Sequence, residues 1–370
     1  MIKELIDLDY NKLRPLRSWN TEITSYEKYL NDRYTNWKQS VSVGQSPNEY
    51  AKPTAVQLEL TSRCNQRCLT CYNRSGANET FTHGSELSVK EWQDVAHQLC
   101  ELGVFQVIVS GGEPTILGDD LFRIMDIFHE AGARFLLITN GMLLDRRRVE
   151  RLARYGYHYL QISMDGATPE LHDYVRQAAG SWHRAVHGAM LAREAGIPLV
   201  IAHTVTKTTV STLPDMVDLA FLLGAERIIL GIFMYSGRAI LNESELSLSK
   251  EETSKYYSIF EQKSRQYHAT QLMEVYDSLD EAVSFRLQIM LPNNVMLIRP
   301  NGDVKVDCAL PFTIGNVRSQ PLVDIWNQQG KSIHTNPRLH EYVKQIRSEE
   351  DIKRLRPRPY VDPDIRLELI

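Results

Sequence analysis

The feature that most constrains the fold is a regular alternation of short apolar runs with longer amphipathic segments, which begins at Ala55. The apolar runs have the length of strands, and the segments between them have the periodicity of helices. The runs are AVQLEL, FQVIVS, RFLLIT, YLQIS, PLVIAHTV and RIILGIF. Six successive strand–helix units predict a parallel sheet with right-handed crossovers. The periodicity fits an open doubly wound sheet or a partial (β/α)6 barrel, and in both folds ligands bind at the carboxyl ends of the strands.

The pattern divides the chain into one large α/β region and smaller flanking regions. Beyond the last unit, NNVMLIRPNGDVKVDC predicts a β-hairpin that turns at Asn301-Gly302, and PLVDIWNQQG predicts a short helix. These elements indicate a separate, small α+β unit. We therefore expect a short helical N-terminal extension at 1–50, the α/β region at 51–240, a helical linker at 241–289, the small unit at 290–335 and a tail at 336–370.

Composition narrows the possible partners and the compartment. The net charge of -4 provides no long-range basic field, so we expect no nucleic-acid partner. No run approaches the roughly 20 apolar residues of a membrane-spanning helix, and the N-terminus MIKELIDLDY has no apolar signal core. We therefore expect a cytoplasmic protein with no membrane partner. Three of its five cysteines fall within eight residues, which in that compartment is typical of metal ligation.

The three clustered thiols predict an iron–sulfur site. Cys64, Cys68 and Cys71 directly follow the first predicted strand, at the edge of the sheet where an active site is expected. A [4Fe–4S] cluster has four irons, so three thiolates leave one iron open to a substrate or cofactor. The main alternative is zinc, but structural zinc sites usually take four ligands in paired spacings, and the sequence has no second pair. Buried core cysteines are disfavoured because Arg63, Asn65, Gln66 and Arg67 around these thiols are polar.

At this point the sequence can be compared with a known family. The motif Cys64-x-x-x-Cys68-x-x-Cys71-Tyr72 resembles the defining motif of the radical S-adenosylmethionine (SAM) superfamily. In that family the second strand ends in a glycine-rich turn whose backbone holds the amino group of the cofactor's methionine. Here FQVIVS runs into Gly111-Gly112-Glu113-Pro114, which is similar to that turn in sequence and position. The resemblance also places Tyr72 near the adenine, with a core position as its alternative.

The resemblance continues along the later strands. The third strand ends in Thr139-Asn140-Gly141 and the fourth in Ser163-Met164-Asp165-Gly166, both similar to family segments that approach the ribose and the methionine carboxylate. Arg176 matches a family arginine that pairs with that carboxylate, and Met234 is a candidate neighbour of the adenine. The implied cofactor-binding residues are thus Thr139, Asn140, Ser163, Asp165, Arg176 and Met234. For each of them the alternative is an ordinary loop-capping, surface or packing role.

The resemblance implies an activity. A reductase, a flavodoxin or a ferredoxin supplies one electron through the cluster, and the C5′–S bond of SAM breaks. The 5′-deoxyadenosyl radical then abstracts a hydrogen atom from the substrate, while the protein excludes water and positions the target C–H bond. An iron–sulfur electron carrier is the non-catalytic alternative, but it would have no use for an open iron beside a cofactor-binding turn.

Two later segments, GIFMYSGRA and IRPNGDVKVDCALPFTIGNVRSQPLVDIW, resemble enzymes with a C-terminal SPASM or twitch domain. The implied fold is a partial (β/α)6 TIM-like barrel followed by a small α+β SPASM-like domain. Such domains usually bind auxiliary clusters through several cysteines, whereas 290–335 contains only Cys308. We therefore expect a single [4Fe–4S] cluster, together with SAM, and a SPASM-like unit that keeps its hairpin and a Gly315-Asn316 turn without metal.

Cys308 has three interpretations. It is a buried core thiol, a remnant of the missing ligand set, or a hydrogen-atom donor to a substrate radical. The first two are favoured because free cysteines are commonly buried and inert. The third is implied by family epimerases that use a thiol in this part of the chain.

The favoured substrate is a ribosomally synthesised precursor peptide, modified by epimerisation, crosslinking or backbone cleavage, because SPASM-like tails most often accompany such substrates. Residues 1–50 are too short for a peptide-recognition domain, which needs about 80 residues, so a separate recognition protein is an expected partner. The alternative is an epimerase or dehydrogenase of a small natural product such as an aminoglycoside sugar, for which the absence of auxiliary clusters is natural.

Overall fold

The structure is a computed structural model that describes residues 35, 38–44, 47–76, 84–268, 273–277, 291–346 and 349–367. The helical extension expected at 1–50 lies largely outside these ranges; within them, residues 38–42 are helical. The first strand begins at Ala55, the residue at which the sequence pattern begins.

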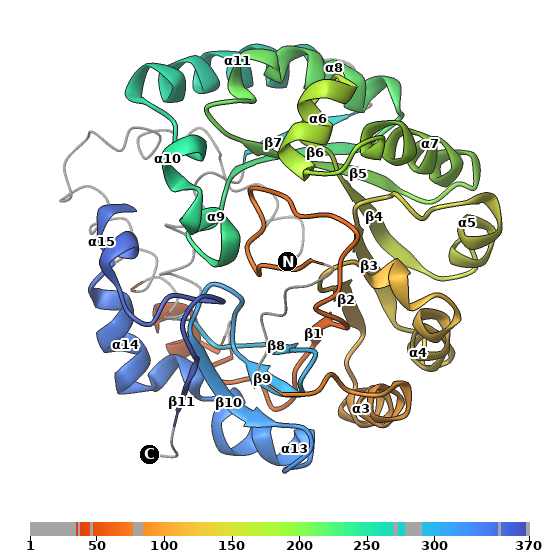
Figure 1. The fold of residues 1–370 in the computed structure, drawn as a ribbon. Coiled ribbons are helices and arrows are strands. Elements are labelled where there is room, and N and C mark those ends of the chain that lie inside the picture. Colours follow the sequence, from red (N-terminus) through yellow and green to blue (C-terminus); the bar gives the residue numbers. More distant parts are fainter. Residues whose placement is uncertain are drawn as a thin grey trace.

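A parallel sheet forms the centre of the molecule (Figure 1). The six predicted strands are confirmed, and they stand in the sheet in the order in which the chain makes them. They curve into an open arc with the helices on its outer side, so the barrel is partial and not closed. The strands are β1 (Ala55–Glu59), β2 (Gln106–Ser110), β3 (Arg134–Thr139), β4 (Tyr157–Ser163), β5 (Leu199–Val205) and β6 (Arg227–Ile232).

The helices between the strands have clear local signals. The side chain of Ser88 accepts a hydrogen bond from the backbone N–H of Glu91, and Glu91 bonds the backbone of Ser88 in return, which forms a capping box at the start of α3. Gly103 ends α3 with a left-handed φ of 83°. The helices are α3 (Val89–Leu102), α4 (Asp119–Glu130), α5 (Arg146–Leu152), α6 (Pro169–Arg176), α7 (Ser181–Glu194), α8 (Leu213–Leu222), α9 (Gly237–Leu241), α10 (Glu243–Leu246) and α11 (Lys250–His268).

The two faces of the sheet differ in polarity. On β1, Val56 and Leu58 point to the apolar core shared with the helices, and both are fully buried. The alternate residues Gln57 and Glu59 therefore point to the inner side of the arc. There the Gln57 side chain donates to the hydroxyl of Ser110 on β2 over 3.2 Å. The inner side of the arc is thus lined by polar groups, which suits a site for a charged cofactor.

The sheet continues past both ends of the predicted series. A seventh strand, β7 (Glu274–Asp277), pairs with β6 in parallel and lies inside the segment 241–289, which the sequence pattern assigned to a helical linker. At the other end, β8 (Val295–Ile298) pairs in parallel with β1, with Val56 opposite Met296. The C-terminal unit therefore extends the same sheet, whose full order is β11-β10-β9-β8-β1-β2-β3-β4-β5-β6-β7.

The predicted hairpin and short helix of the C-terminal unit are confirmed. The chain turns between β8 and β9 (Asp303–Lys305), where Gly302 has φ of 87°. The predicted Gly315-Asn316 turn is wrong: both residues belong to β10 (Phe312–Asn316), at a register shift against β9, and the chain turns after them. The helix is α13 (Leu322–Ile325), which continues into a π-helical turn at Trp326–Gly330.

The segment 336–370, expected to be a plain tail, packs back onto the sheet. It contains α14 (Pro337–Lys344), α15 (Glu349–Arg354) and β11 (Ile365–Arg366), and β11 pairs with β10. Between α15 and β11 the chain turns inward beside α9 (Figure 1). Tyr360, in this turn, is buried.

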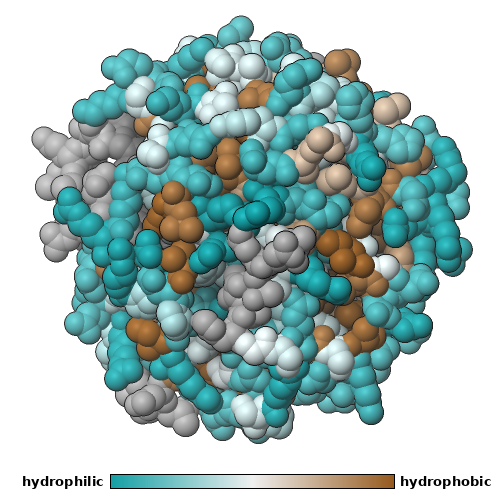
Figure 2. Space-filling model, in the orientation of Figure 1, coloured by the Kyte–Doolittle hydropathy of each residue, from teal (hydrophilic) through white to brown (hydrophobic). Residues whose placement is uncertain are grey.

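The face shown in Figure 2 is mainly polar, with apolar side chains gathered in small, separate patches. Among the described residues, no helix is long and apolar enough to cross a membrane.

Candidate active site

The cysteine loop, residues 62–76, follows β1 and lies on the inner side of the arc (Figure 1). Its three thiols, Cys64, Cys68 and Cys71, are free and half-buried. The start of the loop is joined to the glycine-rich turn, because Glu113 N–H donates to the carbonyl of Arg63 over 2.9 Å. Its middle is joined to the end of α6 by a bond between the backbones of Leu69 and Val175. The loop is therefore anchored on neighbouring elements.

The segment that begins α9 holds the other side of this loop. The backbone N–H groups of Arg238 and Ala239 both donate to the carbonyl of Cys71, over 2.9 and 3.1 Å. The Arg238 guanidinium donates to the carbonyl of Cys68 over 3.1 Å, and the hydroxyl of Ser236 donates to that of Tyr72 over 2.9 Å. The segment that begins α9 thus satisfies the carbonyls of Cys68, Cys71 and Tyr72 and fixes this side of the loop.

Donor groups of the protein lie close to two of the thiols. Arg176 Nη1 is 3.7 Å from Cys68 Sγ, and Asn140 Nδ2 is 3.9 Å from Cys64 Sγ. Burial raises the pKa of the Cys68 thiol to about 11, although the charge of Arg176 opposes this rise. Burial and the neighbouring Cys68 also raise the pKa of Cys64. Cys64 and Cys68 are therefore protonated at neutral pH as free thiols, and binding of iron would displace their protons.

The donor set fits an iron–sulfur cluster better than a single metal ion. Within the described ranges, no three His, Cys, Asp or Glu side chains converge as ligands of one ion. Thiolates of a [4Fe–4S] cluster each bind a different iron, so they do not have to converge on one point. Three free thiols on one anchored loop, with a guanidinium and an amide beside them, provide such a set.

The glycine-rich turn requires both of its glycines. Gly111 has φ of 130°, and a Cβ added there would lie 2.7 Å from the carbonyl oxygen of Thr61. A Cβ on Gly112 would overlap the carbonyl oxygen of Arg63. The two glycines thus let the turn lie directly against the backbone of the cysteine loop. Pro114 begins a short 3₁₀ helix that ends the turn.

Glu113 joins the ends of β2 and β3. Its side chain is fully buried, and one of its oxygens accepts from the hydroxyl of Thr139 over 2.7 Å. The other oxygen accepts from the backbone N–H of Asn140 over 2.7 Å. The Thr115 backbone N–H donates to the first oxygen as well, over 3.1 Å. The carboxylate therefore supports the Thr139-Asn140 turn from inside the protein, and a direct contact of Glu113 or Thr139 with a cofactor remains a prediction.

A second buried carboxylate fixes Arg176. Asp165 is fully buried; one of its oxygens lies 2.9 Å from Arg176 Nε, and the other accepts from the backbone N–H of Thr204 over 2.8 Å. Asp165 therefore faces the arginine. Ser163 ends β4 and is half-buried, and Met234 is half-buried just after β6. The roles of these four residues toward the cofactor remain predictions.

Sequence reasoning missed two residues at the centre of the site. Glu59, the last residue of β1, and Tyr360, in the C-terminal turn, are both buried and hydrogen-bonded to each other. Burial raises the pKa of Glu59, opposed first by the charge of Arg299. A signal was present for Glu59, because a carboxylate at the end of the apolar run AVQLEL has to find partners inside the protein. Tyr360 had no such signal in its polar, proline-rich surroundings.

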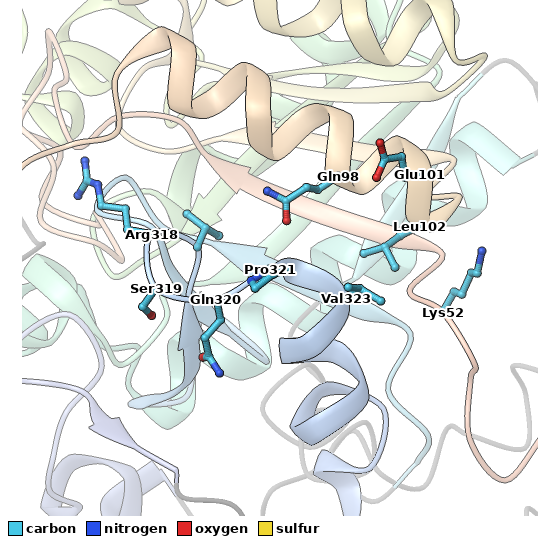
Figure 3. Close-up of a pocket in the computed structure, with 10 residues that line it drawn as sticks. Lys52, Gln98, Glu101, Leu102, Arg318, Ser319, Gln320, Pro321 and Val323 are labelled. Atoms are coloured by element: carbon cyan, nitrogen blue, oxygen red, sulfur yellow. The ribbon is translucent and has the colours of Figure 1, made fainter.

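A groove of about 670 Å³ lies elsewhere (Figure 3). One wall is the second half of α3, and the other is the turn after β10 with the start of α13. It is lined by Lys52, Gln98, Glu101, Leu102, Val317, Arg318, Ser319, Gln320, Pro321 and Val323. Lys52 and Leu102 precede strands whose carboxyl ends carry the cysteine loop and the glycine-rich turn. The groove is therefore separate from the cysteine site.

Comparison with known proteins agrees with this geometry. Residues 58–220 match the model of the radical SAM superfamily, and residues 290–350 match the SPASM model, an iron–sulfur cluster-binding domain. The chain therefore contains a radical SAM domain followed by a SPASM domain. Members of this superfamily are enzymes that bind a [4Fe–4S] cluster and SAM. The matched SPASM segment contains one cysteine, Cys308.

Individual relatives differ in how much of the chain they match. The PqqA peptide cyclase of Rhodopseudomonas palustris is 36% identical over 203 residues, which are 55% of this chain and 53% of that protein. The match thus spans about half the length of the relative. The AdoMet-dependent heme synthase of Methanosarcina barkeri is 26% identical over 323 residues, or 81% of this chain and 86% of that protein.

Solved structures confirm the fold. Streptococcus suis SuiB bound to S-adenosylmethionine superimposes with a TM-score of 0.61 and 17% identity, over 94% of this chain and 85% of SuiB. The AdoMet-bound structure of anSMEcpe gives a TM-score of 0.61 and 16% identity, over 82% of this chain and 83% of that chain. The partial barrel and its C-terminal extension are thus the shared architecture.

Proposed function

We propose that this protein cleaves SAM reductively and uses the resulting radical to abstract a hydrogen atom from a ribosomally synthesised precursor peptide. The observation that carries the proposal is the anchored loop of Cys64, Cys68 and Cys71, which lies against the glycine-rich turn on the inner side of the arc. When bound, the cluster supplies the electron that breaks the C5′–S bond. A reductase, a flavodoxin or a ferredoxin is the electron donor.

The chain's own residues hold and orient the cofactor. Arg176, fixed by Asp165, presents its guanidinium beside Cys68 and can pair with the methionine carboxylate. Gly111 and Gly112 hold the glycine-rich turn against the cysteine loop, where the backbone of the turn can bind the amino group of the methionine. Asn140 and Ser163, at the ends of β3 and β4, supply amide and hydroxyl groups for the ribose.

The peptide substrate is supported by relatives of two kinds. The PqqA peptide cyclases match 55% and 52% of this chain, and SuiB has been solved bound to its precursor peptide SuiA. The reaction on the peptide is epimerisation, crosslinking or backbone cleavage, and a separate recognition protein presents the peptide.

A small-molecule substrate is the second candidate. It is favoured by the match to the AdoMet-dependent heme synthase, because this relative is covered over 86% of its length. If the gene has a neighbour that encodes a short peptide, mass spectrometry after incubation with that peptide discriminates the two substrates. A mass change or an exchange of one deuterium from solvent supports the peptide; an unmodified peptide with continued 5′-deoxyadenosine formation refutes it.

Cys308 is the proposed hydrogen-atom donor if the reaction is an epimerisation. Burial raises the pKa of Tyr72, the neighbour of Cys71, and the charges of Glu59 and Cys308 add to this rise. The Cys308 thiol also forms a hydrogen bond with the carboxyl group of Asp307. Burial raises the pKa of this carboxyl group. Cys308→Ala should stop product formation while 5′-deoxyadenosine still forms. An unchanged yield of product would show that the thiol is a structural remnant.

The central test is anaerobic reconstitution followed by counting of iron and sulfide and by an assay for 5′-deoxyadenosine. The Cys64/Cys68/Cys71→Ala variant is compared with Cys100→Ala, whose thiol packs against the core on α3. About four irons per chain would support a single cluster, provided that the triple variant loses both the iron and SAM cleavage while Cys100→Ala keeps both. Around eight irons per chain would refute the expectation that the SPASM unit holds no cluster. Bound zinc without SAM cleavage would refute the proposal that the protein is a radical SAM enzyme.

A further inference from the structure

The turn between α15 and β11 reaches the cysteine loop from the far end of the chain. We propose that Tyr360 in this turn is a positioning residue for the cluster: it holds Tyr72, and through Tyr72 the backbone at Cys71. The inference rests on the proposed cluster at Cys64, Cys68 and Cys71, and it is independent of the substrate.

The two phenols share one carboxylate oxygen. Tyr360 donates its hydroxyl to Glu59 Oε1 over 2.8 Å, and Tyr72 donates to the same atom over 2.9 Å. Their rings pack edge to face, with centroids 5.5 Å apart. The other oxygen, Oε2, accepts no hydrogen bond from the described residues, and Glu59 is fully buried. Because no solvent replaces a lost donor there, each phenol matters to the carboxylate.

Tyr360 is itself held firmly. The Arg299 guanidinium lies 4.8 Å from the centre of its ring and the Lys305 ammonium 4.9 Å. Both cations are bonded to Asp364, at 2.5 and 2.9 Å. Lys305 is fully buried, and Arg299 and Asp364 are nearly so. Two cations that share the carboxylate of Asp364 thus hold the ring from the C-terminal unit, at cation–π distances.

A second contact from the same turn reaches the other side of Cys71. The carbonyl of Pro359, the residue before Tyr360, accepts from the backbone N–H of Gly237 over 3.0 Å. The next residue, Arg238, donates its own N–H to the carbonyl of Cys71 over 2.9 Å. A Cβ on Gly237 would overlap the carbonyl of Tyr72, so the fit is close. Pro359 and Tyr360, which are adjacent in the turn, therefore support the chain on both sides of Cys71.

Tyr360→Phe tests the proposal because it removes the hydroxyl and keeps the ring. The holoenzyme is reconstituted, and release of iron to a chelator is followed without SAM or substrate. We expect release about five-fold faster than in the parent, the effect of losing one buried hydrogen bond. The electron paramagnetic resonance spectrum of the reduced cluster should change as well, since the geometry around Cys71 relaxes.

Tyr342→Phe is the matched control. Tyr342 is buried in the same C-terminal region and donates to the carbonyl of Pro357 over 3.1 Å, which lies outside the cysteine loop. It should release iron within two-fold of the parent and keep the parental spectrum. Equal rates in the two variants would overturn the proposal, because the effect would then be one of general stability.

A double-mutant cycle adds an independent measurement. Tyr72→Phe alone should accelerate iron release in the same way. Because both phenols donate to one carboxylate, the acceleration in the double variant should differ from the product of the accelerations in the two single variants. Strictly multiplicative effects would refute coupling through Glu59. If the parent binds no iron, the proposed function fails first; a stable cluster that is insensitive to Tyr360→Phe refutes only this inference.

Discussion

Replacement of the buried Glu113 by glutamine tests how the ends of β2 and β3 are joined. The carboxylate accepts three hydrogen bonds on one oxygen, from the Thr115 N–H, the Thr115 hydroxyl and the Thr139 hydroxyl, and one on the other oxygen, from the Asn140 N–H. Glutamine has the same shape, but only one of its two terminal atoms accepts.

The magnitude follows from this mismatch. In Glu113→Gln the amide nitrogen faces either the Asn140 N–H or the donors from Thr115 and Thr139, so at least one buried donor loses its acceptor. A lost bond to a charged group costs about 1.5–3 kcal/mol, and the carboxylate's own burial cost is relieved in part. We expect the free energy of unfolding to fall by about 2–3 kcal/mol.

Urea unfolding under anaerobic conditions, followed by far-ultraviolet circular dichroism, measures this change. Glu130→Gln, the same substitution at an exposed position on α4, is the control and should stay within about 0.5 kcal/mol of the parent. Affinity for SAM should also fall, because Asn140 shifts. A loss below about 0.5 kcal/mol in Glu113→Gln would refute the reasoning.

Two further predictions concern the cysteine loop and the contact between α3 and the C-terminal unit. Gly112→Ala should lower bound iron per chain in reconstituted protein, because the new Cβ overlaps the Arg63 carbonyl and displaces the loop; full iron occupancy would contradict this. The hydrogen bond from Arg318, together with those from Ser88, lowers the pKa of Glu91 from 4.5 to about 2. A lowered folded pKa contributes stability above about pH 4.5 that disappears as the pH falls toward 2. In Arg318→Met the unfolding midpoint should therefore fall less steeply as the pH is lowered from about 4.5 to 2. A slope equal to that of the parent would refute a contribution of the Arg318–Glu91 pair to stability.

Much of the fold and the candidate cysteine loop could be predicted because their signals are local. A strand that begins at Ala55, a capping box at Ser88 and a turn at Gly302 each depend on a few neighbouring residues. The spacing of Cys64, Cys68 and Cys71 is equally local, and so is the glycine-rich turn that follows the second strand. These features need no knowledge of the tertiary structure.

The sequence by itself thus determined the alternating strands and helices, the loop of three thiols and the hairpin of the C-terminal unit. Only the tertiary structure decided that β8 pairs with β1, that a seventh strand extends the sheet, and that Tyr360 bonds Glu59 across 301 positions of the chain. The physical reason is that periodicity records which face of an element is buried, whereas the partner on that face is chosen by packing among segments distant in the sequence.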